Sequence, residues 1–354
     1  MLLAYIVEPF LLRNGETMSQ NHTHHLESVA IAESFLALGY DVDVIDYRNA
    51  AFQPNRNYSF FVSARTNFVK ISERLNKDCI KIAHLDTAHF LFNNAAAFGR
   101  LLEMQERRKA SAWSLKVIEK NWAPEYADYC AVLGNQFTLD TYRYAGKKMF
   151  RLPVPTPIAY PSPEKKNVDS VRKNFLWFGS GGLVHKGLDL TLEAFSRLPD
   201  FHLTVCGPIE SLSEREFRQA YIKELYETDN IDTIGWVDVS STKFLDIMSN
   251  CIGLVYPSCS EGQSGAVITC MRAGLIPIIS IESGVDVQDF GTLLKDCSVD
   301  EIVRSVSKLA SASPSELLKR AIRTWQYAGQ HHTQSRYSKR YQEMIKTIRA
   351  DALN

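Results

Sequence analysis

Residues 174–195 read NFLWFGSGGLVHKGLDLTLEAF, an apolar run, a glycine-rich turn and an amphipathic segment in direct succession. The run Phe175–Phe178 is short and wholly apolar, which is typical of a strand buried on both faces. From Leu188 to Leu198, apolar residues recur at helical spacing. A strand, a glycine turn and a helix in this order predict the first βα unit of a parallel sheet.

The same alternation runs through both halves of the chain. In the second half we expect further strands at 201–206, 252–256 and 276–281, and helices at 217–226 and 266–273. In the first half we expect strands at 2–7, 42–45, 60–64, 79–84 and 129–133, and helices at 26–36 and 101–120; the tail 315–348 reads as helical. Short apolar runs that alternate with helices predict an α/β fold with a doubly wound, Rossmann-like sheet in each half.

Dense prolines between Pro153 and Pro163 mark the boundary between the halves. Proline cannot continue a helix or a central strand, so this stretch reads as a linker. A length of 354 residues also suggests two domains. We therefore expect an N-terminal domain over 1–155 and a C-terminal domain over 165–331, with a terminal helix near 332–354 that packs back on the first.

The composition excludes several classes of protein. Forty basic residues offset forty acidic ones, which argues against a dedicated nucleic-acid binder. No apolar stretch approaches the roughly 18 residues of a membrane-spanning helix, and the N-terminus lacks the basic region of a signal peptide. The seven cysteines form no C-x-x-C pair and lie mostly in apolar runs. We therefore expect core thiols in a cytoplasmic protein, with no metal site.

Two loops of the second half follow expected strands, where ligands of open parallel sheets bind. In Gly179–Gly187 the glycines allow close backbone approach and Lys186 supplies a charge for phosphate, although the spacing is not that of a P-loop. The alternative is a flexible turn with a solvated lysine. In Ser258–Gly265, small residues leave amide groups free at a helix start, a ready anion site. Glu261 would repel phosphate there, so sugar hydroxyls are its natural partner; the alternative is that it caps the helix.

The run from Ser260 to Ile279 resembles the donor-site loop and helix of retaining glycosyltransferase family 4 and its GT-B relatives. The stretch Phe175–Leu190 resembles the first strand and phosphate-contacting loop of their second domain, and Phe201–Gly207 the following strand. The resemblance implies two Rossmann-like domains that face each other across a cleft. A nucleotide-sugar donor would lie mostly on the second domain and an acceptor on the first. Transfer would retain the anomeric configuration and require no metal cofactor.

The resemblance also implies roles for particular residues. Glu261 would contact the transferred sugar, and Lys186 would neutralise the departing diphosphate. The donor would be held by Gly181, Gly182, His185, Gly207, Gly262, Gln263, Ser264, Gly265, Ala266 and Thr269. Two positions depart from the family pattern: Thr269 stands where a second glutamate usually holds the ribose, and Ser180 stands where an arginine is usual.

On the acceptor side, relatives often present a histidine from the first sheet, which makes His89 a catalytic candidate. His84 and Asp86 come from the same region, and a lone histidine is more often structural. Residues Arg13, Asn14 and Gly15 follow the first strand and should face the cleft. The cluster Asn21, His22, His24, His25 and Glu27 has metal-like composition, but polar residues at a helix start explain it better.

We therefore predict an enzyme that moves a sugar from a UDP-, GDP- or ADP-linked donor to the hydroxyl of a carbohydrate or glycolipid acceptor, in cell-surface polysaccharide or glycolipid synthesis. The alternatives are a catalytically silent GT-B binding or assembly protein, and an enzyme of the same fold such as a sugar-nucleotide epimerase or a phosphorylase. The basic residues Arg107, Arg108, Lys109, Lys147 and Lys148 could contact the inner face of an anionic membrane, or could be solvated surface.

Overall fold

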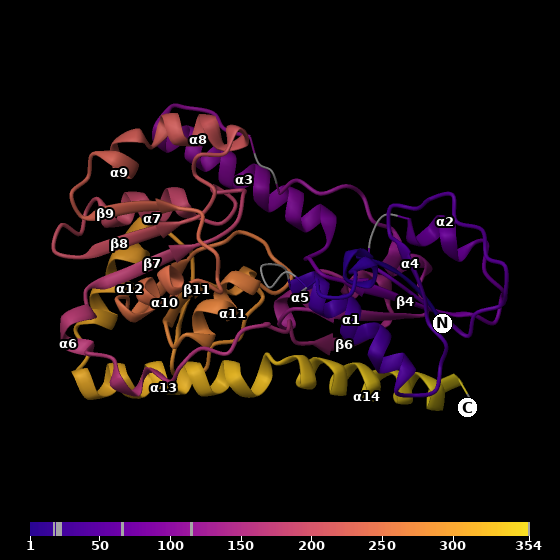
Figure 1. Ribbon diagram of the computed structural model, residues 1–354. Helices are drawn as coiled ribbons and strands as arrows, with labels where there is room; N and C mark the ends of the chain where they lie inside the picture. The colour runs from indigo at the N-terminus through magenta and orange to yellow at the C-terminus, as the bar shows by residue number, and fades with distance from the viewer. Residues whose placement is uncertain (17, 19–22, 65–66, 114–115, 353–354) are drawn as a thin grey trace. The chain divides into compact units, whose positions relative to one another are not determined.

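The structure is a computed structural model, and it describes residues 1–16, 18, 23–64, 67–113 and 116–352. The chain forms two compact units (Figure 1). The first unit comprises Met1–Phe90, Glu119–Pro157 and His331–Asn354, and the second comprises Leu91–Ile118 and Ile158–Gln330. Each unit contains a six-stranded sheet whose neighbouring strands pair in parallel. This architecture confirms the predicted α/β fold class.

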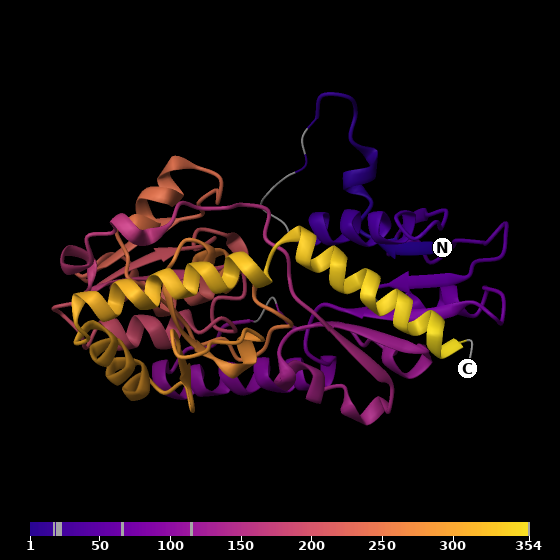
Figure 2. The same ribbon diagram turned by 90° about the horizontal axis from the view of Figure 1, so that it is seen from below.

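The sheet of the first unit has the order β2-β1-β3-β4-β5-β6. Its elements are β1 (Leu2–Tyr5), η1 (Glu8–Leu11), α1 (Thr23–Leu36), β2 (Asp43–Asp46), β3 (Phe60–Ser63), α2 (Phe68–Ser72), β4 (Ile80–Leu85), α4 (Ala123–Tyr126), β5 (Tyr129–Leu133), α5 (Gln136–Asp140), η2 (Arg143–Ala145), β6 (Lys148–Leu152) and α14 (Gln334–Ala352). The last helix, α14, packs on α1 (Figure 2), where Ser34 Oγ donates to the Ser338 carbonyl at 3.4 Å.

The sheet of the second unit has the order β12-β11-β10-β7-β8-β9. Its elements are α3 (Phe90–Arg108), η3 (Pro163–Lys165), α6 (Val168–Val171), β7 (Asn174–Phe178), α7 (Leu188–Phe195), β8 (His202–Cys206), η4 (Leu212–Glu214), α8 (Arg215–Ala220), α9 (Ile222–Tyr226), β9 (Ile231–Gly235), α10 (Thr242–Ser249), β10 (Gly253–Tyr256), α11 (Gly265–Arg272), β11 (Ile276–Ser280), η5 (Ile281–Ser283), β12 (Thr292–Leu294), α12 (Val299–Ala310) and α13 (Pro314–His331). The helical tail predicted over 315–348 is thus divided into α13 and α14.

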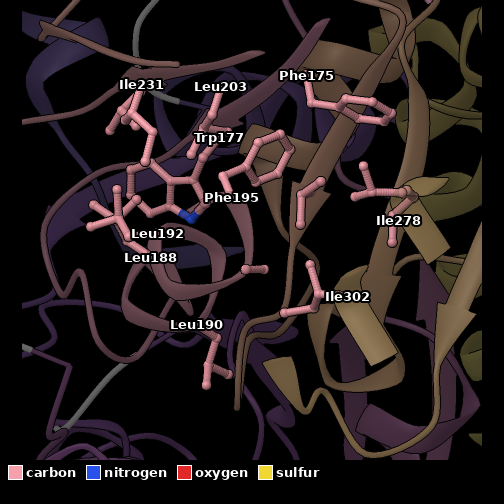
Figure 3. Close-up of a cluster of buried hydrophobic side chains, with 14 of the residues drawn as sticks. Phe175, Trp177, Leu188, Leu190, Leu192, Phe195, Leu203, Ile231, Ile278 and Ile302 are labelled. Atoms are coloured by element: carbon pink, nitrogen blue, oxygen red, sulfur yellow. The ribbon is translucent and has the colours of Figure 1, made fainter. Parts of the chain in front are cut away.

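Strands β7, β8 and β11 and helix α7 share one apolar core (Figure 3). Phe175 and Phe195 lie with ring centroids 5.9 Å apart, and both are fully buried, as is Trp177. Burying a side chain of this size contributes about 1.5–3 kcal/mol. The core therefore fixes β7 and α7, so the loop between them, residues 179–187, begins and ends on rigid elements.

The helix predicted over 101–120 is wrong in its bounds. Helix α3 begins at Phe90 and ends at Arg108. Lys109 has a φ of 54°, a left-handed backbone conformation that terminates the helix. Asparagine is a weak helix former, so Asn93 and Asn94 weakened the sequence signal for the first turns of α3. Charged residues continue past Arg108 and gave no signal for its end.

Partly buried ion pairs join α3 to the rest of the second unit. Arg107 Nη2 donates to Asp189 Oδ2 of α7 at 2.5 Å, and Arg108 Nη1 donates to Glu224 Oε1 of α9 at 2.8 Å. Burial raises the pKa of Asp189 to about 6, although nearby Arg100 and Arg107 oppose that rise. These contacts group 91–118 with the second unit, whereas the sequence had suggested one N-terminal domain over 1–155.

The ion pairs also bear on the hypothesis of membrane contact. Arg107 and Arg108 form the ion pairs with Asp189 and Glu224 described above. Lys148 Nζ donates to Asp351 Oδ2 at 2.6 Å. Three of the basic residues on which the hypothesis rested are therefore balanced by carboxylates. Within the described ranges, we find no helix that combines the length and apolarity needed to cross a bilayer.

Candidate functional site

The strand order of the second unit determines where its ligand site should lie. Strand β7 pairs on one side with β8 and on the other with β10, so the connections diverge between β7 and β10. Ligands of open parallel sheets bind at such a switch point, beyond the carboxyl ends of the two strands. The loops that follow β7 and β10 are 179–187 and 257–264, the two that the sequence had singled out.

Direct bonds hold these two loops together. The amide of Cys259 donates to the His185 carbonyl at 2.9 Å, and His185 Nε2 bonds the Ser260 carbonyl. Between them Gly187 has a φ of +70°, and a β-carbon added there would stand 2.4 Å from the Pro257 carbonyl oxygen. A larger residue at Gly187 would therefore force the loops apart, which explains why glycine follows Lys186.

The two loops bring Lys186 and Glu261 into direct contact. Lys186 Nζ donates to Glu261 Oε1 at 2.5 Å and to the Tyr256 hydroxyl at 2.8 Å. The Tyr256 hydroxyl in turn donates to Glu261 Oε1 at 2.9 Å. The side chain of Lys186 is 5% exposed and that of Glu261 is 17% exposed. The carboxylate is therefore the more accessible end of a compact triad.

The protonation states in this triad follow from its charges. Burial raises the pKa of Glu261, but Lys186 above all, together with Lys116 and with His185 in its protonated form, outweighs burial and brings the pKa to about 2. Burial likewise lowers the pKa of Lys186, but Glu261 and Tyr256 outweigh it and raise the pKa above its ordinary value. At neutral pH the site therefore contains an ionised carboxylate held by an ammonium group.

The start of α11 adds backbone donors beside Glu261. The side chain of Ser264 caps this helix by accepting from the Val267 amide at 3.5 Å. The amides of Glu261 and Ser264 each donate at 2.9 Å to carbonyls of η5, which fixes the loop against the next strand connection. The N–H groups of Gly265 and Ala266 have no acceptor within their own helix, as at any helix start. They can donate hydrogen bonds to an anionic group here.

The glycine loop itself contacts a carboxylate. The Gly182 amide donates to Glu214 Oε1 at 2.5 Å, and the Leu183 amide also bonds this buried carboxylate. On its other side Gly182 faces Lys116, since an added β-carbon would lie 2.5 Å from Lys116 Cγ. Sequence reasoning missed Glu214, Lys116 and Tyr256. Only Tyr256 had a local signal, because it is the last residue of an expected strand.

The remaining donor-side candidates lie around the same switch point. Gly207 follows β8, and its amide donates to the Gly235 carbonyl at 3.0 Å. Gly181 and Thr269 are partly exposed, and Gly262 and Gln263 are buried. Burial lowers the pKa of His185 to about 4, so this imidazole is neutral at pH 7. His185 therefore adds little positive charge to the site.

In the first unit, His84 belongs to a buried polar cluster at the end of β4. The Tyr5 hydroxyl donates to Glu27 Oε2 at 2.9 Å, and His24 Nδ1 lies 3.3 Å from the same oxygen. His84 Nε2 lies 3.7 Å from it, and Asp86 Oδ2 is 3.9 Å from His24 Nδ1. His84 therefore lies near the fully buried Glu27, and Asp86 lies near His24, which contacts the same carboxylate.

Glu27 gives a stability prediction with a defined pH dependence. Burial raises its pKa, but His24 and His84 outweigh burial and hold the pKa well below the ordinary 4.5. The stability that the ionised form contributes is present above pH 4.5 and is lost as pH falls below it. The wild-type advantage over Glu27→Gln in free energy of unfolding should therefore stay nearly constant from about pH 7 to about pH 5, and it should shrink from about pH 5 to about pH 3.

Urea unfolding at about pH 7, about pH 5 and about pH 3 measures this difference. Glu33→Gln, on an exposed position of the same helix, is the matched control and should show no such change. An advantage of wild type over Glu27→Gln that stayed constant with pH would contradict the prediction.

His89, the catalytic candidate, is buried in a second polar group of the first unit. Its Nε2 bonds the Tyr144 hydroxyl at 3.0 Å, and that hydroxyl donates to Glu125 Oε1 at 2.8 Å. Burial lowers the pKa of His89 despite the opposing charge of Glu125. The imidazole is therefore neutral at pH 7 and hydrogen-bonded within its own unit.

Arg13, Asn14 and Gly15 are exposed after η1, and the Arg13 amide donates to Glu16 Oε2 at 2.9 Å. Asn21 and His22 lie outside the described residues. Among the residues that the structure describes, no group of three or more His, Cys, Asp or Glu is placed to hold a metal ion.

The part of the chain that holds the two loops also matches a known protein family. Residues 172–312 match the model of the family described as glycosyl transferases, group 1. This segment includes both loops and the triad of Lys186, Tyr256 and Glu261. No curated protein sequence matches the chain.

Solved structures match the whole fold at low identity. Sucrose-phosphate synthase from Thermosynechococcus elongatus is 12% identical with a TM-score of 0.66, over 99% of this chain and 98% of that one. HepE of Anabaena, in complex with UDP and glucose, is 12% identical with a TM-score of 0.60, over 99% and 98%. TarM of S. aureus is 11% identical with a TM-score of 0.55; 80% of this chain covers 54% of TarM, about half its length.

Residues 172–312 are therefore similar to glycosyl transferases group 1, and the solved structures share the fold of this chain.

Proposed function

We propose that the chain transfers a sugar from a nucleoside diphosphate donor to the hydroxyl group of a carbohydrate or glycolipid acceptor. The observation that carries the proposal is the contact between Lys186 and Glu261 at the switch point of the second sheet, beside the start of α11. An ionised carboxylate suits sugar hydroxyls, while cations and helix-start amides suit a diphosphate. This one site therefore offers contacts for both the sugar and the diphosphate of a donor.

In the proposed reaction, the bond between the anomeric carbon and the diphosphate oxygen breaks. The acceptor oxygen forms a new bond to that carbon on the same face, and the acceptor proton passes to the departing phosphate oxygen. Glu261 positions the sugar through its hydroxyls. Lys186 stabilises the negative charge that develops on the leaving group, which is where a fixed cation lowers the barrier most.

Lys186 has a second role in this proposal. An ammonium group has three donors, and two of those of Lys186 go to Tyr256 and Glu261. Lys186 thereby keeps Glu261 ionised and oriented. Gly262, Gln263, Gly265 and Ala266 line the diphosphate side of the donor, with Gly181, Gly207 and Thr269 on the nucleoside side. On the acceptor side, His84, Asp86, His89 and the exposed 13–15 segment remain candidates for contact with the acceptor.

The first test is donor binding. Calorimetry with UDP-, GDP- and ADP-glucose should show binding of one donor class by the wild-type protein. UDP-linked sugars come first, because HepE and TarM have both been solved in complex with UDP. Product analysis with a carbohydrate acceptor should then show a glycoside with retained anomeric configuration, whereas an inverted product would contradict the retaining mechanism.

Binding without turnover would favour the alternative of a catalytically silent binding protein. Thr269 is the observation that favours this alternative, since a threonine holds a ribose more weakly than a carboxylate does. A panel in which no nucleotide sugar binds would overturn the proposed function.

A further inference from the structure

The two oxygens of the Glu261 carboxylate have different surroundings. Oε1 accepts from Lys186 Nζ at 2.5 Å, from the Tyr256 hydroxyl at 2.9 Å and from Ser258 Oγ at 3.4 Å. In the part of the chain that the structure describes, no hydrogen bond to Oε2 is found. Because Oε2 is not one of the described buried polar atoms that lack a partner, it is accessible to solvent. The protein therefore holds one oxygen of Glu261 and leaves the other to a ligand.

Of the two hydroxyl groups at Oε1, that of Tyr256 is the stronger donor. Ser258 has a single proton, and its Oγ lies 3.4 Å from two carbonyl oxygens as well as from Glu261 Oε1. The Tyr256 hydroxyl accepts from Lys186 Nζ at 2.8 Å, so its own proton is directed to Glu261. Burial raises the pKa of Tyr256, so the phenol keeps this proton at neutral pH.

The ring of Tyr256 is held by a rigid part of the second unit. Tyr256 is the last residue of β10, is fully buried and pairs in register with Ile279 of β11. Its ring stacks on Trp177 of β7, with centroids 6.3 Å apart and an interplanar angle of 26°. The Trp177 indole donates to the Lys186 carbonyl at 3.2 Å. Strands therefore fix the hydroxyl, whereas Glu261 lies on a loop and has several rotamers to choose from.

The backbone of that loop is fixed without help from Tyr256. The amides of Glu261 and Ser264 each donate at 2.9 Å to carbonyls of η5. Gly265 and Ala266 follow directly, at the start of α11, where their N–H groups can donate to a diphosphate. The Tyr256 hydroxyl bonds only side chains in this part of the site. Its removal should therefore affect the carboxylate and leave the diphosphate contacts unchanged.

We propose that Tyr256 is a positioning residue for sugar transfer, which holds Glu261 Oε1 so that Oε2 faces the sugar of the donor. The proposal rests on the proposed function, because it assumes a nucleotide sugar at this site. A carboxylate that is not held can turn between different hydroxyl groups of the sugar. With Oε1 held, Oε2 accepts from the sugar in one orientation, which places the anomeric carbon for reaction. Tyr256 acts through Glu261 and does not itself contact the donor.

The test compares nucleotide sugars with the matching nucleoside diphosphates. Affinities of wild type and Tyr256→Phe for UDP-glucose and UDP, GDP-glucose and GDP, and ADP-glucose and ADP are measured by calorimetry. Phenylalanine keeps the ring on Trp177 and removes only the hydroxyl. For the donor class that wild type binds, we expect Tyr256→Phe to weaken nucleotide-sugar affinity about tenfold, the value of one hydrogen bond to a charged group. Affinity for the nucleoside diphosphate should not change.

Kinetics and two further variants complete the test. The turnover number for sugar transfer should also fall about tenfold in Tyr256→Phe, because the sugar is less well aligned. Tyr226→Phe removes a hydroxyl from an exposed tyrosine of the same unit and should behave like wild type. Ser258→Ala removes the weaker donor and should change nucleotide-sugar affinity by less than about threefold.

The outcomes distinguish the two proposals. A selective loss of nucleotide-sugar affinity or of turnover, with nucleoside diphosphate affinity intact, supports the positioning role. If wild type binds a nucleotide sugar and Tyr256→Phe equals it in affinity and turnover, that role is refuted and the proposed function stands. Equal losses for nucleotide sugar and nucleoside diphosphate would show a structural effect and would also refute the positioning role. If wild type binds no nucleotide sugar, both proposals fail.

Discussion

Replacing Glu261 by glutamine should lower the turnover number for sugar transfer by about 10²- to 10³-fold, the effect of removing one preorganised electrostatic group from an active site. Glutamine has the same shape and can still accept from Lys186 and Tyr256, so the loop geometry should persist. The variant lacks the negative charge that orients the sugar. Loss of that charge should not weaken binding of the free nucleoside diphosphate, because it removes a repulsion.

Steady-state kinetics with the donor identified by calorimetry, together with nucleoside diphosphate affinity, measures both effects. Glu227→Gln removes a carboxylate from an exposed position of the same unit and is the matched control. Unchanged turnover in Glu261→Gln, with donor binding intact, would remove Glu261 from the mechanism.

Replacing Lys186 by methionine should lower the free energy of unfolding by about 3–5 kcal/mol, the usual cost of leaving one member of a buried ion pair alone. Lys186 is the more buried member, and its removal leaves Glu261 beside an apolar side chain. Adding Glu261→Gln to this variant should recover part of the loss, because the unpaired charge disappears. The two substitutions should therefore be strongly non-additive.

Chemical denaturation of the two single variants and the double variant provides the cycle. The control is Lys223→Met, at an exposed lysine of the second unit, which should change stability by less than about 0.5 kcal/mol. Additive effects would mean that Lys186 and Glu261 are not energetically coupled, whatever their separation in the structure.

Much of this site could be predicted from local sequence. The loops after β7 and β10 follow short apolar runs and precede helices, and parallel pairing brings such loops to one edge of a sheet. The contact between Lys186 and Glu261 could not be predicted from local sequence, because it depends on the order of the strands in the sheet. Only the adjacency of β7 and β10 places residues 75 positions apart within hydrogen-bonding distance.

The parts that could not be predicted depend on long-range contacts. Lys116 and Arg100 carry no motif, and they reach the second unit because Arg107 and Arg108 of α3 find carboxylates there. The short strands β6, β9 and β12 were likewise missed. Strand β9 reads IDTIG and has little apolar pattern of its own, so its pairing with β8 supplies its stability. Edge strands of this kind are stabilised by pairing with the neighbouring strand, so their own residues give little signal in the sequence.

The discontinuous course of the chain has a consequence for biosynthesis. Residues 91–118 leave the ribosome long before the strands that they join, because the second unit is completed only when Ile158–Gln330 has been made. The first unit in turn needs α14, which follows all of the second. Neither unit can therefore finish folding during synthesis of its first segments. Until the rest of the second unit is made, the arginines of α3 lack their carboxylate partners and its apolar side chains stay exposed. Contacts of such long sequence separation form slowly, so the nascent chain should depend on protection from aggregation during this interval.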